Sequence, residues 1–168
     1  MGDMMRLDKN WDMIRKVFES SKSSFHCSIA TVNADGTPNV IPIGSLELRD
    51  DMSGYFFDSF LQKTAINFRE RNRICVLAVN SDLSYWHKSL KCGVFDPPPA
   101  IRLMGIVLEK RKAIGDELEK WLERISYFKD TPGYNKLWKD MNMVWDLEFD
   151  SFEPTVIPSK MLNNPWIS

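Results

Sequence analysis

Lys63 and Thr64 are the residues of this 168-residue chain best placed to bind an anion. They follow an aromatic-rich segment, Tyr55 to Phe60, that is typical of a strand, and a short helix is predicted from Lys63 to Arg71. The first N–H groups of a helix lack intrahelical partners and carry the positive end of its dipole. Lys63 adds a full charge there, Thr64 adds a hydroxyl donor, and Asn67 lies four residues later on the same helix face. The pattern predicts a phosphate site, but it is also compatible with an ordinary solvated helix start.

Other chemically capable residues give weaker indications. His26 and Cys27 are neighbours on a predicted strand, so their side chains point to opposite faces and packing is the better interpretation. His87 lies in the irregular segment Ser81 to Pro99, where it is a candidate for lining a substrate site or donating a proton. The two histidines and three scattered cysteines form no cluster of ligands, so no metal is expected.

Composition narrows the function classes. Lys and Arg total 22 against 23 Asp and Glu, so the chain lacks the basic excess of a protein that binds nucleic acid through phosphates. Three cysteines without a CxxC pair favour a reducing compartment over a disulfide scaffold. The N-terminal segment is acidic and has no signal-like apolar region, and the longest apolar run, Ile74 to Val79, is too short for a membrane span. We therefore expect a cytoplasmic protein with no membrane or nucleic-acid partner.

Alternating and apolar segments separated by turns predict six strands. Asp35-Gly36 supplies the positive-φ position of a tight hairpin between the first two strands. The expected strands are 25–33, Pro38 to Leu48, Tyr55 to Phe60, Arg73 to Asn80, Ile101 to Lys110 and Val144 to Ile157. This succession predicts a mainly β (α+β) fold: a six-stranded antiparallel split β-barrel with flanking helices, in a single domain of residues 1–168 whose barrel occupies about 24–158.

Helical spacing marks two amphipathic segments. Trp11, Ile14, Val17 and Phe18 predict a first helix. The clearest amphipathic pattern runs from Ile114 to Phe128 and begins a predicted helical insertion over about residues 114–143. The charged residues of that helix are expected to form its solvated face: Glu117, Glu119, Lys120, Glu123 and Arg124.

Two segments in this order resemble a known family. The hairpin ATVNADGTPNVIPIG is followed by YFFDSFLQKTAINFRERNRICVLAV, with its K-T-x-x-N element after an aromatic strand. Together they resemble the FMN-binding split barrels of the pyridoxamine 5′-phosphate oxidase-like superfamily, to which small FMN-binding proteins and flavin reductases are similar. The resemblance covers about residues 24–110 and extends to the strand near 144–158.

The resemblance implies a site for FMN. Its flavin ring would lie along the backbone of Pro42, Ile43, Gly44 and Ser45, where Gly44 allows close approach. Phe57, Asp58 and Ser59 would flank the ring or the ribityl chain. Gln62, Lys63 and Thr64 would hold the phosphate, with Asn67 beside them. Family members often have Arg where Gln62 stands, so this site has one charge fewer, and Arg69, Arg71 and Arg102 are candidates to compensate.

The resemblance also implies an assembly and an activity. Such barrels are homodimers with flavin at the interface, and Trp138 and Trp145 are candidates for the partner's wall. We expect an FMN-dependent oxidoreductase acting on an unidentified small molecule. The tail, Met161 to Ser168, lacks an Arg-rich motif, so pyridoxamine phosphate oxidase activity itself is not expected. The alternatives are a barrel that binds deazaflavin F420 or haem, and a non-catalytic flavin-binding electron carrier or sensor.

Overall fold

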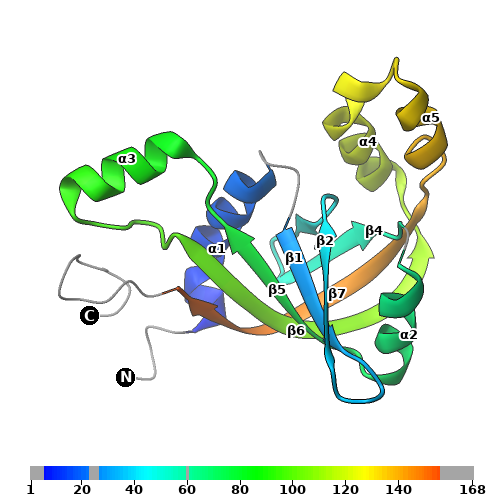
Figure 1. The fold of residues 1–168 in the computed structure, drawn as a ribbon, viewed down its shortest axis with the longest axis horizontal. Helices are drawn as coiled ribbons and strands as arrows, with labels where there is room; N and C mark the ends of the chain where they lie inside the picture. The colour runs from blue at the N-terminus through cyan, green and yellow to red at the C-terminus, as the bar shows by residue number, and fades with distance from the viewer. Residues whose placement is uncertain (1–5, 23–26, 60, 156–168) are drawn as a thin grey trace.

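The computed structural model describes residues 6–22, 27–59 and 61–155. Within these ranges seven strands form one antiparallel sheet in the order β2-β1-β5-β6-β7-β4-β3 (Figure 1). The strands are β1 Cys27–Val32, β2 Pro38–Ile43, β3 Glu47–Leu48, β4 Ser53–Phe57, β5 Arg73–Val79, β6 Ala100–Lys112 and β7 Met143–Pro154. The helices are α1 Leu7–Lys22, α2 Gln62–Glu70, α3 Leu83–Cys92, α4 Gly115–Arg124, the 3-10 helix η1 Ser126–Phe128 and α5 Pro132–Leu137.

The predicted antiparallel barrel is confirmed, with one strand more than expected. The segment Pro38 to Leu48 is not one strand: β2 pairs with β1 at one edge of the sheet, and β3 pairs with β4 at the other. Three residues, 44–46, connect the two edges, and this length of chain spans at most roughly 14 Å between Ile43 and Glu47. The sheet must therefore curl until its edges approach each other, which makes it a barrel.

The β1–β2 hairpin has the predicted turn. Gly36 has a φ of +84°, which a residue with a side chain rarely adopts, and its N–H donates to the Asn33 carbonyl over 2.9 Å. The Asp35 carboxylate accepts bonds from the backbone N–H and the hydroxyl of Thr37. These local bonds set the register that pairs Thr31 with Asn39.

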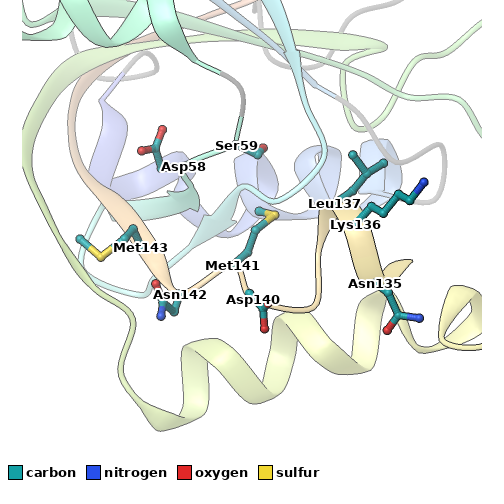
Figure 2. A pocket seen from close by; sticks show the side chains of 9 residues that line it. All are labelled: Asp58, Ser59, Asn135, Lys136, Leu137, Asp140, Met141, Asn142 and Met143. Atoms are coloured by element: carbon teal, nitrogen blue, oxygen red, sulfur yellow. The ribbon is translucent and has the colours of Figure 1, made fainter. Parts of the chain in front are cut away.

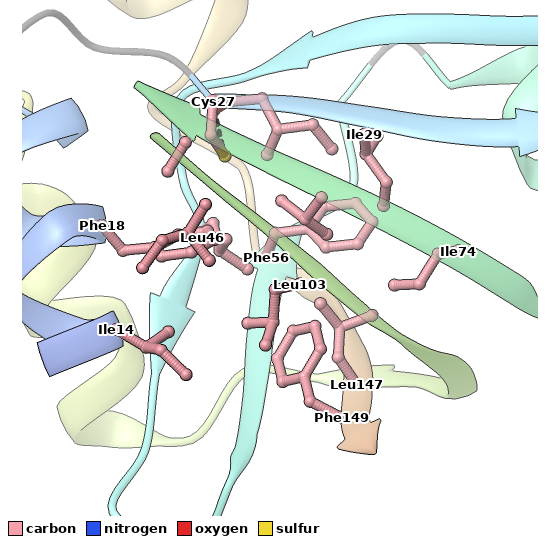
Figure 3. Close-up of a cluster of buried hydrophobic side chains, with 14 of the residues drawn as sticks. Ile14, Phe18, Cys27, Ile29, Leu46, Phe56, Ile74, Leu103, Leu147 and Phe149 are labelled. Carbon is pink, nitrogen blue, oxygen red and sulfur yellow. Dashed lines mark hydrogen bonds between the residues drawn. The ribbon is translucent and has the colours of Figure 1, made fainter. Parts of the chain in front are cut away.

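The main core lies inside the curved sheet and is closed by α1 (Figure 3). The apolar stripe of α1 predicted from spacing is buried: Trp11, Ile14, Val17 and Phe18 are each at most 4 % exposed. They pack against the inward residues of the strands, among them Phe56, Leu103 and Leu147. Burying this stripe removes a large apolar area from water, which fixes α1 against the sheet.

Helices lie at two opposite ends of the molecule. The segment Ser81 to Pro99, expected from the sequence to be irregular, contains α3, which extends over ten residues. Asp82 caps its start by accepting from the Ser84 N–H, and Gly93, at φ +68°, ends it. Helices α4, η1 and α5 lie between β6 and β7 in the chain, at the opposite end from α3 (Figure 1). We call Gly115–Leu137 the helical insertion.

None of the helices in the described ranges has the length and apolar character needed to span a membrane.

Candidate functional site

A pocket of about 390 Å³ lies between the barrel and the helical insertion, and we call it the insertion pocket. Its barrel side is formed by three residues that follow or end β2 and by one that follows β4: Pro42, Gly44, Ser45 and Ser59. Its other side is formed by apolar residues of the insertion and the segment after it: Trp121, Ile125, Phe128 and Trp138. Four of the predicted cofactor residues therefore meet at one cavity, which is within the usual size range of small-molecule sites.

The barrel side of the insertion pocket is held by hydrogen bonds. The Ser45 hydroxyl accepts from the Phe57 N–H over 3.0 Å, which ties the bend after β2 to β4. The Gly44 carbonyl accepts from Arg124 Nη1 over 2.8 Å, and Arg124 also forms an ion pair with Glu47. These bonds attach the insertion to the strand ends, so both sides of the pocket are positioned together.

The insertion side is a cluster of aromatic rings. Trp121 is 7 % exposed and stacks on Phe57, with the ring centroids 5.4 Å apart and the planes at 25°. Trp138 meets Trp121 edge-on at 6.4 Å and Phe128 at 5.5 Å. Since Trp138 and Phe128 are only half-buried, they keep apolar surface toward the pocket. The indole N–H of Trp121 is buried and has no hydrogen-bond partner among the described residues.

A second hollow of about 330 Å³ adjoins the insertion pocket, because Ser59 lines both. Asp58 and Ser59 face the segment around Leu137 and Met141 across it (Figure 2). Asp58 is not a free carboxylate, because Lys110 on β6 forms an ion pair with it. The Lys110 ammonium also lies 5.8 Å from the centroid of the Trp145 ring.

The N-terminus of α2 lies next to these hollows. Ser59 and Gln62 are three residues apart, so their Cα atoms are separated by at most roughly 11 Å. No side chain among the described residues caps α2, which leaves the backbone N–H groups of its first turn to bind an anion. Gln62 and Lys63 are exposed there. The pKa of Asp35 is lowered first by its bonds from Thr37 and also by the Lys63 charge, which places Lys63 near the β1–β2 turn.

Thr64 and Asn67 are buried, and they fasten α2 to the β1–β2 hairpin. Asn39 Nδ2 donates to the Thr64 hydroxyl oxygen over 3.0 Å. Asn67 Nδ2 donates to Thr31 Oγ1 and to Asn33 Oδ1, each over 2.9 Å. Both donor positions of the Asn67 amide are thus used within the protein, so these contacts show Asn67 positioning the helix.

The remaining candidates lie away from the two hollows. Arg71 donates to the Ala34 carbonyl over 3.3 Å, and Arg102 forms an ion pair with Glu153. Trp145 is buried in the main core against Phe68, so it is not exposed to a partner. His87 is exposed on α3, at the far end of the molecule from the helical insertion (Figure 1). His26 and Phe60 lie outside the described residues.

The expectation of a solvated face is wrong for Glu117 and for Arg124, whose side chain is only 13 % exposed and is bound to Glu47 and the Gly44 carbonyl. Glu117 is 2 % exposed and accepts bonds from Arg49, from Arg111 and from the Ile114 N–H. Both arginines also bind Asp146 on β7. Burial alone would raise the pKa of Glu117, but the bonds from Arg111, Ile114 and Arg49 outweigh it and lower that pKa to about 2. The network attaches the start of α4 to the sheet beneath it.

Several solved structures have a similar architecture. An FMN-binding protein from Syntrophomonas wolfei subsp. wolfei superposes with a TM-score of 0.53 at 16 % identity, over 89 % of this chain and 94 % of that one. An F420 reductase gives a TM-score of 0.54 at 14 % identity, covering 83 % and 94 %. A candidate pyridoxamine 5′-phosphate oxidase from Lactobacillus delbrueckii gives 0.50 at 14 %, covering 91 % and 97 %.

This chain has the pyridoxamine 5′-phosphate oxidase-like split-barrel fold. The resemblance expected from the two sequence segments is thereby confirmed for the fold. Among family models and curated proteins, nothing matches the sequence. A shared fold does not define a function, so the function must be inferred from the side chains at the end of β2, after β4 and at the start of α2.

Proposed function

We propose that this split barrel binds FMN and acts as a flavin-dependent oxidoreductase on a small molecule. The observation that carries the proposal is the adjacency of two sites: the insertion pocket and the uncapped N-terminus of α2 with Lys63. FMN has a planar ring system with one polar edge at one end and a phosphate at the other. One molecule would place its ring against Pro42 to Ser45 and its phosphate on the first turn of α2.

Each end of FMN has a physical reason to bind. The phosphate would accept bonds from the free N–H groups of Gln62, Lys63 and Thr64 and would pair with the Lys63 ammonium, and charge-assisted bonds of this kind contribute about 1.5–3 kcal/mol each. The ring would be desolvated between the strand backbone and apolar side chains of the insertion. When bound, FMN supplies electron and hydride transfer, while the protein holds and shields it.

F420 is the alternative cofactor that a specific observation favours, because an F420 reductase shares the fold. Haem is less well supported, since no histidine among the described residues lines the insertion pocket or the hollow beside it. A non-catalytic carrier or sensor would use the same FMN site and would differ only in lacking turnover with a small molecule.

The proposed assembly is a homodimer with flavin at its interface. A row of residues crosses four strands on the outer face of the sheet, because Val40 is opposite Ala30, Ala30 is opposite Cys75, and Cys75 is opposite Met104. Leu77 and Val79 lie on the same face of β5 as Cys75. We call these six residues the outer apolar face. Val40 is 62 % exposed and Val79 is 47 % exposed, and burying such a surface would favour association of two copies.

We place this activity in the cytoplasm. The support is that the three cysteines, all within the described residues, form no disulfide with one another, as expected of a protein made in a reducing compartment: Cys27, Cys75 and Cys92.

The proposed function is tested by cofactor identity and by dependence on the phosphate. The purified protein is examined by absorbance and by mass spectrometry of its co-purifying small molecule, and the cofactor-free protein is then titrated with FMN, riboflavin and F420. We expect a flavin spectrum and FMN binding at least tenfold tighter than riboflavin. Equal affinity for FMN and riboflavin would show that the protein does not bind the phosphate. A deazaflavin spectrum would favour F420. Absence of turnover with NAD(P)H and a panel of acceptors would favour the non-catalytic carrier or sensor.

A further inference from the structure

The chain that connects the two edges of the sheet is short and forms part of the insertion pocket. Residues 44–46 join β2 to β3, and Gly44 and Ser45 line the pocket. Leu46 is buried in the main core, and the Ser45 hydroxyl accepts from the Phe57 N–H. The connection is therefore fixed to the core and to β4, and a flavin ring bound as proposed would lie against its backbone.

Arg124 of α4 holds both ends of this connection. Its Nη1 donates to the Gly44 carbonyl over 2.8 Å, and its guanidinium pairs with Glu47, the first residue of β3. Both charged side chains are mostly buried. A charge-assisted bond away from water is strong, so the guanidinium fixes the direction of the Gly44 carbonyl.

The guanidinium also carries its charge close to the pocket. Burial lowers the pKa of Arg124, and the charge of Glu19 on α1 opposes this effect, but the guanidinium stays protonated at ordinary pH. The carboxylate of Glu47 balances this charge from β3. In a site of low polarity each of these charges acts more strongly than in water. Removing the cation or removing Glu47 therefore changes the electrostatic potential at the pocket in opposite directions.

We propose that Arg124 is a positioning residue for the cofactor ring, and that the helical insertion is thereby part of the cofactor site. Arg124 fixes the backbone at Gly44 against which the ring binds, and its charge favours the reduced ring, which has gained electrons. The inference rests on the proposed function, because it requires a flavin ring on Pro42 to Ser45. It adds to that site a side chain from α4, 80 residues after Gly44 in the chain.

The first test asks whether Arg124 acts on the ring or on the phosphate. The cofactor-free wild type and Arg124→Gln are titrated with FMN and with riboflavin, and circular dichroism checks that both proteins are folded. We expect the variant to bind both ligands about tenfold more weakly, since both contain the ring. Arg73→Gln, which removes a guanidinium from the exposed pair with Asp150, should bind both as the wild type does. Unchanged affinities in Arg124→Gln, or a loss for FMN alone, would overturn the role at the ring.

The second test separates this role from a merely structural one. The reduction potential of bound FMN is measured at saturating FMN for the wild type, Arg124→Gln and Glu47→Gln. We expect a more negative potential in Arg124→Gln, which loses the cation, and a more positive one in Glu47→Gln, which loses the carboxylate paired with it. Shifts of the two variants in the same direction, or no shift, would overturn the proposal.

Glu47→Gln keeps the proposal testable if Arg124→Gln does not fold, because the guanidinium and its bond to the Gly44 carbonyl remain. A potential in Glu47→Gln that is not more positive than that of the wild type would then be decisive against it. If the wild type binds neither FMN nor riboflavin, the proposed function fails and this inference fails with it. If the wild type binds both and Arg124→Gln behaves in the same way, the proposed function stands and only the role of Arg124 is refuted.

Discussion

At the scale of single residues, Lys63 has the clearest expected effect on cofactor binding. It is exposed at the first turn of α2, so its ammonium can contact a phosphate without supporting the core. We expect Lys63→Ala to weaken FMN binding at least tenfold, about 1.4 kcal/mol, in a fluorescence titration. The thermal midpoint should stay unchanged, since an exposed side chain is lost.

Two comparisons make this prediction specific to the phosphate. Lys120→Ala removes the same charge from an exposed position of α4 and should leave FMN affinity unchanged. Riboflavin, which has no phosphate, should bind the wild type and Lys63→Ala equally. A loss of affinity for both ligands would show that Lys63 acts on the ring site or on the fold instead.

Glu117 should make stability depend on pH in a defined acid range. Its pKa is lowered to about 2 in the folded protein, from an ordinary value of 4.5. A lowered pKa means that Glu117 stabilises the folded state fully above about pH 4.5 and that this stabilisation is lost as pH falls toward 2. The stabilisation is at most on the order of 3 kcal/mol, from the difference between the two pKa values.

The measurement is urea unfolding of the wild type and Glu117→Gln between pH 6 and pH 2.5. We expect the difference in unfolding free energy between the two proteins to be largest above pH 4.5 and to shrink below it, because the wild-type carboxylate becomes protonated. Asp150→Asn, which alters an exposed pair with Arg73, should give a much smaller difference. If the difference in unfolding free energy between wild type and Glu117→Gln were constant with pH, Glu117 would not be bound to the arginines as a carboxylate.

At the scale of elements, the attachment of α2 to the β1–β2 hairpin depends on Asn67. The Asn67 amide supplies two hydrogen bonds from a site that is 3 % exposed. Asn67→Ala should lower the free energy of unfolding by about 2–4 kcal/mol, because Thr31 and Asn33 lose a buried donor. Ile66→Ala, at the preceding, exposed position of the same helix, should cost well under 1 kcal/mol, and urea denaturation measures both variants. Equal effects of the two variants would show that the amide does not hold the helix.

Elements set by local signals could be predicted from the sequence. Asp35-Gly36 predicts the hairpin because a tight turn needs a positive φ, and the spacing from Trp11 to Phe18 predicts the buried stripe of α1. The division of 38–48 into β2 and β3 was not predicted, although Pro42 and Gly44-Ser45 were a usable signal for a break in the segment. It follows from pairing with β1 on one side and β4 on the other, which is decided by the closed sheet.

In the candidate site too, some residues could be predicted from the sequence and others depend on contacts between distant segments. The resemblance selected Pro42, Gly44, Ser45 and Ser59, and the structure brings these residues to one pocket. Spacing marked Trp121 as part of an apolar helix face, but its pocket forms only when the insertion meets β2 and β4. Glu117 lies four residues before Trp121 and hence on the same side of α4, and this spacing could have predicted that Glu117 is buried. Its partner Arg49, 68 residues earlier in the chain, could not be read from the sequence.

At the scale of the whole molecule, the proposed homodimer depends on the outer apolar face. Leu77 is 36 % exposed near its centre and is opposite Arg102 on β6. Leu77→Glu would therefore gain an opposite charge across the strands in the monomer, which limits any loss of stability. In a homodimer the same carboxylate would be buried against apolar residues, which carries a penalty of several kcal/mol.

We expect the wild type to sediment as a dimer and Leu77→Glu to sediment as a folded monomer with the same circular dichroism spectrum. Tyr127→Glu places the same charge at a position that is 89 % exposed on the insertion and should remain dimeric. If flavin lies at the interface, Leu77→Glu should also bind FMN more weakly, because one side of its site would come from the second copy. A Leu77→Glu dimer would place the interface elsewhere, whereas a monomer with full FMN affinity would show that each copy holds its flavin alone.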